Sequence, residues 1–118
     1  EQHPELAHTL DRPLCGEPRL AFCYVKPECS DAFESYIIDR LDHCALVKRS
    51  EELLDEGWFG RGAAHPHLRD RIGDYALIMK RHCVIKDALP GEPPFRQIGV
   101  HGGLSADEMH VPLILLEP

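Results

Sequence analysis

The apolar run from Val111 to Leu116 constrains the fold of this chain more than any other feature of its sequence. A run without polar alternation is typical of a strand whose two faces are both buried. Pro112 biases Val111 away from helical backbone, so a helix cannot continue into the run. The sequence therefore predicts a core strand here, and such a strand needs protein on both of its faces.

The residues just before this run predict a fixed loop that carries a histidine. His101 is followed by two glycines, so the backbone beside its imidazole has no side chains and can adopt positive φ. Ser105 and Glu108 stand at capping-box spacing, which predicts a short helix starting at Ala106. Residues 97–118 are thus interpreted as a ligand-bearing loop followed by the core strand.

The preceding residues, 19–86, predict a small α/β lobe. Apolar alternation indicates strands, and Phe33, Ile37 and Leu41 repeat at the four-residue spacing of a buried helix stripe. The order of elements argues for a mixed-sheet α/β sandwich with helices on at least one face. The expected elements are strands at 19–26 and 45–47, helices at 4–12, 30–43, 50–57 and 66–73, a hairpin of 75–79 with 83–85, and a proline-rich loop at 87–96.

Composition narrows the class of protein. A length of 118 residues, with 43% hydrophobic and 28% charged residues, fits one globular domain over 1–118. A net charge of −7 argues against a nucleic-acid-binding surface, which needs a concentrated basic face. No apolar run approaches the roughly 18 residues that span a bilayer. Five cysteines without a C-x-x-C pair do not suggest a disulfide framework, so we expect a reducing, cytoplasmic setting.

The C-terminal motif resembles a known signature. From His101, the pattern His-Gly-Gly-Leu-Ser-x-x-Glu-Met-x-Val-Pro-Leu is similar to that of the alkaline phosphatase superfamily, most closely its type I phosphodiesterase/nucleotide pyrophosphatase branch. The similarity extends upstream through 13–19, 57–60 and 65–74. In that superfamily the histidine of this motif binds one of two catalytic zinc ions, so the resemblance implies that role for His101.

The resemblance covers nearly the whole chain but only the C-terminal portion of the family's catalytic unit. The family's Asp-His-Gly motif is absent here, and neither Thr9 nor any serine lies in a context like that of its nucleophile. The chain opens with Glu1 rather than methionine, so it either lost an N-terminal piece or was cut from a longer gene, and the resemblance favours the second. The resemblance therefore implies a phosphate ester hydrolase whose other ligands lie in an N-terminal remainder, and a chain that is inactive alone.

Two alternatives remain open. His65 and His67 could pair on a metal, although Pro66 fits the first position of a helix and favours a surface role. For the whole chain, a stand-alone α/β small-ligand-binding or dimerisation module without catalysis is the rival to the hydrolase. A coding sequence that extends far upstream of Glu1 and contains an Asp-His-Gly motif and a metal-binding threonine would exclude that rival.

Overall fold

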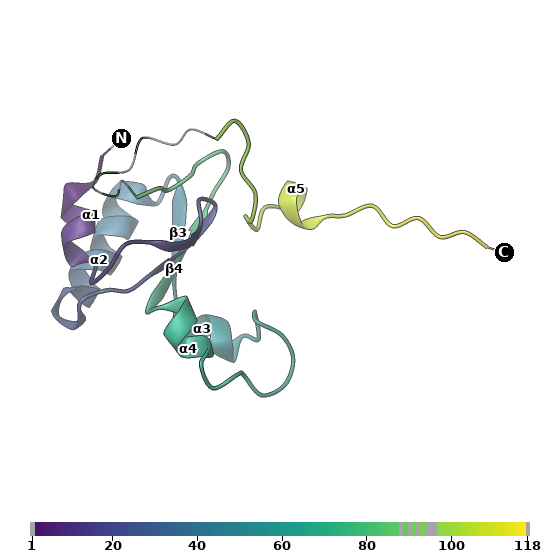
Figure 1. Ribbon diagram of the computed structural model, residues 1–118, viewed down its shortest axis with the longest axis horizontal. Helices are drawn as coiled ribbons and strands as arrows, with labels where there is room; N and C mark the ends of the chain where they lie inside the picture. Colours follow the sequence, from purple (N-terminus) through teal and green to yellow (C-terminus); the bar gives the residue numbers. More distant parts are fainter. Residues whose placement is uncertain (1, 88, 90, 92, 94–96, 118) are drawn as a thin grey trace.

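The computed structural model describes residues 2–87, 89, 91, 93 and 97–117 (Figure 1). Its elements confirm the predicted mixed α/β organisation, whereas the predicted loop at 87–96 falls in part outside the described residues. In chain order they are α1 (Pro4–Thr9), β1 (Cys15–Glu17), β2 (Leu20–Cys23), the 3-10 turn η1 (Pro27–Cys29), α2 (Ser30–Tyr36), the π-helical turn η2 (Ile37–Leu41), β3 (Ala45–Arg49), α3 (Ser50–Asp55), α4 (Leu68–Ile72), β4 (Tyr75–Met79) and α5 (Ala106–Met109).

The four strands form one sheet in the order β1-β2-β4-β3, and every neighbouring pair is antiparallel. The prediction of a mixed sheet is therefore wrong in strand direction. The last strand in the sequence, β4, returns between β2 and β3 and runs against both, with Leu77 opposite Ala21 on one side and Val47 on the other. Side-chain alternation identifies a strand but does not give its direction after a connection as long as 50–74.

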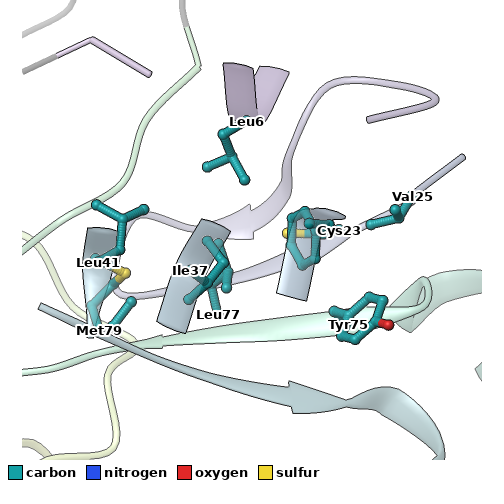
Figure 2. Packing of buried hydrophobic residues seen from close by; sticks show 10 residues of the cluster. Leu6, Cys23, Val25, Ile37, Leu41, Tyr75, Leu77 and Met79 are labelled. Atoms are coloured by element: carbon teal, nitrogen blue, oxygen red, sulfur yellow. The ribbon is translucent and has the colours of Figure 1, made fainter. Parts of the chain in front are cut away.

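The hydrophobic core lies on one face of this sheet (Figure 2). Helices α1 and α2 and the turn η2 pack on that face, as the repeat of Phe33, Ile37 and Leu41 predicts. The ring of Phe33 lies 5.0 Å from that of Tyr75 in β4, centroid to centroid. On the opposite face Leu46 is 43% exposed, whereas Ala76 and Ile78 are buried. The ring of Phe22 lies 6.3 Å from that of Phe59, so the loop after α3 covers part of this face.

The helix predicted at 30–43 forms as two consecutive segments. α2 runs to Tyr36 and continues without a break into η2, which ends at Leu41. Ile37 and Leu41 are both buried, whereas Ile38 is 56% exposed. The four-residue stripe is confirmed, and the wider π turn η2 still directs Ile37 and Leu41 toward the sheet.

The hairpin predicted from 75–79 and 83–85 forms only in part. The chain does turn after β4, where Arg81 has a φ of +50°, but residues 83–85 make no strand. The amide of Ile85 instead donates to the carbonyl of Pro18, 2.9 Å away in the β1–β2 turn. The returning segment therefore crosses the end of the sheet rather than pairing with β4, whose two edges are already taken by β2 and β3.

The C-terminal run 111–117 makes no strand ladder with any described residue and extends away from the body (Figure 1). Its apolar side chains are 80% or more exposed at Val111, Leu113, Ile114, Leu115 and Leu116. A strand needs a neighbour to satisfy its backbone N–H and C=O groups. Within the described residues the predicted core strand is therefore not formed, because β1 and β3 do not supply that neighbour.

Candidate functional site

The loop 101–105 begins with His101, whose side chain is exposed, and lies against the edge of the sheet at β1. Gly102 has a φ of +86°, a conformation that side-chain-bearing residues rarely adopt. A Cβ at Gly102 would lie 3.1 Å from Cγ of Glu17 in β1. The first glycine therefore turns the chain directly after the histidine and lets it approach the strand closely.

The second glycine makes room for a carboxylate. Gly103 is buried, and a Cβ there would overlap the two carboxylate oxygens of Glu108. Oε1 of Glu108 accepts a hydrogen bond from the Gly103 amide at 3.2 Å. The Gly-Gly pair is thus explained by a positive φ at the first position and by close packing at the second.

The capping box predicted from Ser105 and Glu108 is present. Oε2 of Glu108 accepts hydrogen bonds from the Ser105 amide at 3.3 Å and from the Ser105 hydroxyl at 2.6 Å. α5 begins at Ala106 and ends at Met109, with His110 as its C-cap. The prediction of a short helix ahead of Pro112 is confirmed.

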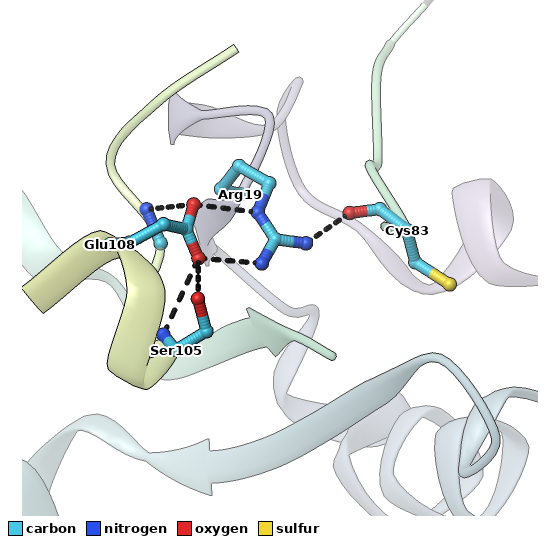
Figure 3. Close-up of polar contacts among 5 residues, drawn as sticks. Arg19, Cys83, Ser105 and Glu108 are labelled. Atoms are coloured by element: carbon cyan, nitrogen blue, oxygen red, sulfur yellow. Dashed lines mark hydrogen bonds and ion pairs between the residues drawn. The ribbon is translucent and has the colours of Figure 1, made fainter. Parts of the chain in front are cut away.

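Arg19 joins this loop to the sheet (Figure 3). Its Nε donates to Oε1 of Glu108 at 2.9 Å and its Nη2 donates to Oε2 at 2.7 Å, so the pair is bidentate across 89 residues of sequence. Its Nη1 donates to the carbonyl oxygen of Cys83 at 2.6 Å. One guanidinium therefore connects the start of β2, the segment that follows β4 and the loop that follows His101.

The electrostatics of the pair favour the ionised carboxylate. The hydrogen bonds from Arg19, followed by those from Ser105, lower the pKa of Glu108 to about 2. The bond to Glu108 in turn raises the pKa of Arg19, which is only 4% exposed. A charge-assisted pair of this geometry, with one partner buried, is stronger than the exposed ion pairs elsewhere on the surface.

Sequence reasoning missed Arg19. It stands just before the strand and within the stretch 13–19 of the upstream resemblance, but nothing local to it indicates a partner near residue 108. The only sequence signal for a buried ion pair is an arginine directly before an otherwise apolar strand. A charged residue in that position needs a partner if it is buried.

The imidazole of His101 makes no hydrogen bond or ion pair with the described residues, and the residue is exposed at the start of the loop. Neutral imidazole nitrogen is a preferred zinc ligand, and the residue therefore fits the role that the resemblance implies. Within the described part of the chain, however, no three His, Cys, Asp or Glu side chains are grouped so that they could hold a metal ion.

The other histidines form no comparable site among the described residues. His65 and His67 have ring centroids 5.6 Å apart, and Nδ1 of His65 accepts a hydrogen bond from the amide of His67. Nδ1 of His67 lies 3.2 Å from Oδ2 of Asp70, with both side chains largely exposed. These contacts begin the turn into α4, as the surface interpretation predicts.

Two hollows lie away from the loop. One of about 420 Å³ lies between α3, α4 and the start of β4, and its arginines are already paired with carboxylates, Arg49 with Glu34 and Arg69 with Glu51. The other, about 600 Å³, lies between α1 and residues 83–87 and is mainly apolar. Cys23 lies within the nearby core, where burial raises the pKa of its thiol to about 12 and keeps it protonated.

Comparisons with family models, with curated proteins and with solved structures return no match for this chain. No helix among the residues that the structure describes is long and apolar enough to cross a membrane.

Proposed function

We propose that this chain is the C-terminal portion of a zinc-dependent phosphodiesterase/nucleotide pyrophosphatase-like phosphohydrolase, to which it supplies one metal ligand, His101. The observation that carries the proposal is an exposed imidazole with no partner among the described residues, followed at once by a loop that a buried arginine and a carboxylate hold in place. A loop whose backbone is already fixed presents its histidine to a metal with a smaller ordering cost than a flexible loop does.

When bound, a pair of zinc ions would stabilise the charge of a phosphate ester during displacement and activate the nucleophile. The residues of this chain would act around that centre. His101 would offer one ring nitrogen, and the Gly-Gly turn, which packs against Glu17 and Glu108, would fix the backbone that follows it. The nucleophile and the other ligands would come from polypeptide upstream of Glu1, so the 118 residues alone would be inactive.

The apolar run supports the same proposal. Leu113 to Leu116 are 80% or more exposed, a costly arrangement for consecutive aliphatic residues. We infer that Val111 to Leu116 enter the sheet of the upstream polypeptide as the buried strand that their pattern predicts. The five cysteines without a C-x-x-C pair favour a cytoplasmic setting for the complete protein.

The rival proposal, a stand-alone ligand-binding or dimerisation module, has little support from the smaller hollow. In the 420 Å³ hollow, Arg49 and Arg69 are already paired with carboxylates, and an anionic ligand would have to displace them. The coding sequence distinguishes the hydrolase from the module, because the module requires translation to begin near Glu1 and the hydrolase requires coding sequence upstream of it.

The test is a histidine substitution in the complete protein. His101→Ala is expected to remove most hydrolysis of bis(4-nitrophenyl) phosphate and to lower the zinc content measured by elemental analysis, while circular dichroism stays unchanged. The matched control is His110→Ala, an exposed histidine at the end of α5 that should keep both. Near-normal turnover and zinc content in His101→Ala would refute the ligand assignment.

A further inference from the structure

We propose that Arg19 is a positioning residue for His101: its guanidinium fixes Glu108, and Glu108 fixes the backbone that leaves the histidine. The proposal rests on the proposed function only in treating His101 as a metal ligand. Its geometric part stands on contacts within the described residues.

The anchor of this arrangement is rigid. The Arg19 carbonyl accepts a hydrogen bond from the Met79 amide at 3.0 Å, so its backbone is tied to the end of β4. The next residue, Leu20, pairs with Ile78 in the sheet. With 4% exposure and three donor nitrogens engaged, the side chain has little freedom left.

The second link runs from the carboxylate to the loop backbone. Glu108 accepts from the amides of Gly103 and Ser105, two and four residues beyond His101. These bonds leave the loop few alternatives, since the carboxylate fills the space beside Gly103. A shift of Glu108 would therefore move the exit of the turn that places the imidazole.

Arginine is needed here rather than a generic cation. Both oxygens of Glu108 are engaged by two nitrogens of one planar group, and the third nitrogen reaches Cys83. A lysine ammonium is a single point of charge and cannot reproduce the two parallel bonds. Arg19→Lys should therefore keep the charge and lose the orientation.

The loss of Arg19 or Glu108 is expected to weaken zinc binding, because both residues fix the loop that carries His101. Residues that hydrogen-bond a metal ligand typically change metal affinity by about 10–100-fold when they are replaced, and Arg19 acts on His101 through the loop backbone, so the lower end of that range, about tenfold, applies here. We expect zinc to bind about tenfold more weakly in Arg19→Lys and in Glu108→Gln, and excess zinc to restore the maximal rate. A merely structural role would lower thermal stability without rescue by zinc.

The experiment uses the complete protein and three variants. Arg19→Lys tests the guanidinium, Glu108→Gln tests the same contact from the loop side, and Arg49→Lys is the control, because Arg49 pairs with Glu34 away from the loop. Zinc affinity is measured by competition with a chelator. Hydrogen exchange of the peptide covering 101–109 is followed by mass spectrometry, and we expect it to quicken by about tenfold or more in the first two variants only.

The outcomes are separable. Unchanged hydrogen exchange of the loop in both Arg19→Lys and Glu108→Gln would show that the contact between Arg19 and Glu108 does not fix the loop. Faster exchange with unchanged zinc affinity would overturn the positioning role while leaving the proposed function intact. If His101→Ala leaves zinc content unchanged, the proposed function fails, and the positioning role fails with it.

Discussion

Gly73 packs directly against the carbonyl of Cys23: a Cβ at position 73 would lie 2.5 Å from that oxygen. The glycine has φ +60° and ψ −156°, a combination open almost only to glycine. Its neighbour Asp74 continues the contact, because its amide donates to the Cys23 carbonyl oxygen at 2.8 Å and its Oδ2 accepts from the Val25 amide at 2.8 Å. The turn that ends α4 is thereby joined to β2 before β4 begins.

Gly73→Ala is expected to lower the free energy of unfolding by about 2–6 kcal/mol, with about 1–3 kcal/mol from backbone strain and about 1–3 kcal/mol from the contact with Cys23. Gly62→Ala is the matched control: Gly62 also has positive φ, at +103°, but no described atom lies within 4 Å of the place where its new methyl group would stand. Denaturant unfolding of both variants checks the prediction. Equal losses would mean that the contact with Cys23 carries no cost.

Ile37→Ala and Ile38→Ala form a second matched pair, because the two residues are adjacent but 1% and 56% exposed. Removing the buried side chain should cost about 2–5 kcal/mol through lost burial and the cavity left behind. The exposed change should stay within about 0.5 kcal/mol. Chemical denaturation measures both values, with the same dependence of the unfolding free energy on denaturant concentration used for the two variants. A large loss for Ile38→Ala would contradict the assigned helix face.

The loop should also loosen in acid. Because the pKa of Glu108 is lowered to about 2 from an ordinary 4.5, the folded state favours the carboxylate over the carboxylic acid. Its contribution is therefore complete above about pH 5 and is lost as the pH falls from about 4.5 through 2. The Glu108 carboxyl carbon, followed by nuclear magnetic resonance, should titrate near pH 2.

In Arg19→Gln the same resonance should titrate closer to the ordinary value, because the largest cause of the lowered pKa is gone. Glu108→Gln supplies the assignment control, since its side chain does not titrate. A midpoint that is the same in the wild type and in Arg19→Gln would contradict the ion pair.

Truncation of the 118-residue chain after His110 should leave the stability of the lobe unchanged within about 0.5 kcal/mol, because residues 111–117 pair with no strand of the described sheet. Self-association should decrease at the same time, since exposed aliphatic runs promote it. Thermal unfolding and sedimentation velocity give the two readouts. A clear drop in unfolding temperature would show that the tail packs on the lobe.

Local patterns predicted the parts of this fold that local physics determines. The helix stripe ending at Leu41, the stop at Gly73 and the capping box of Ser105 with Glu108 all depend on residues within one or two turns of each other. Each was found because spacing along the chain equals proximity in space there.

The rest depends on contacts between distant residues. The antiparallel direction of β4, the crossing of Ile85 over Pro18 and the pairing of Arg19 with Glu108 each join segments whose order gives no hint of their meeting. For the site, the sequence supplied His101 and its glycines but not the arginine that fixes their loop. The zinc ligand role itself stays a prediction.

The central place of β4 also matters while the chain is being synthesised. Until Met79 has left the ribosome, β2 has only the short β1 beside it and β3 has no strand partner in the described sheet. Glu108 emerges later still, on the order of seconds at roughly 5–20 residues per second. The sheet that carries Arg19 can therefore assemble before Glu108 is available to pair with it, and a sheet that failed to assemble would leave Glu108 without its partner.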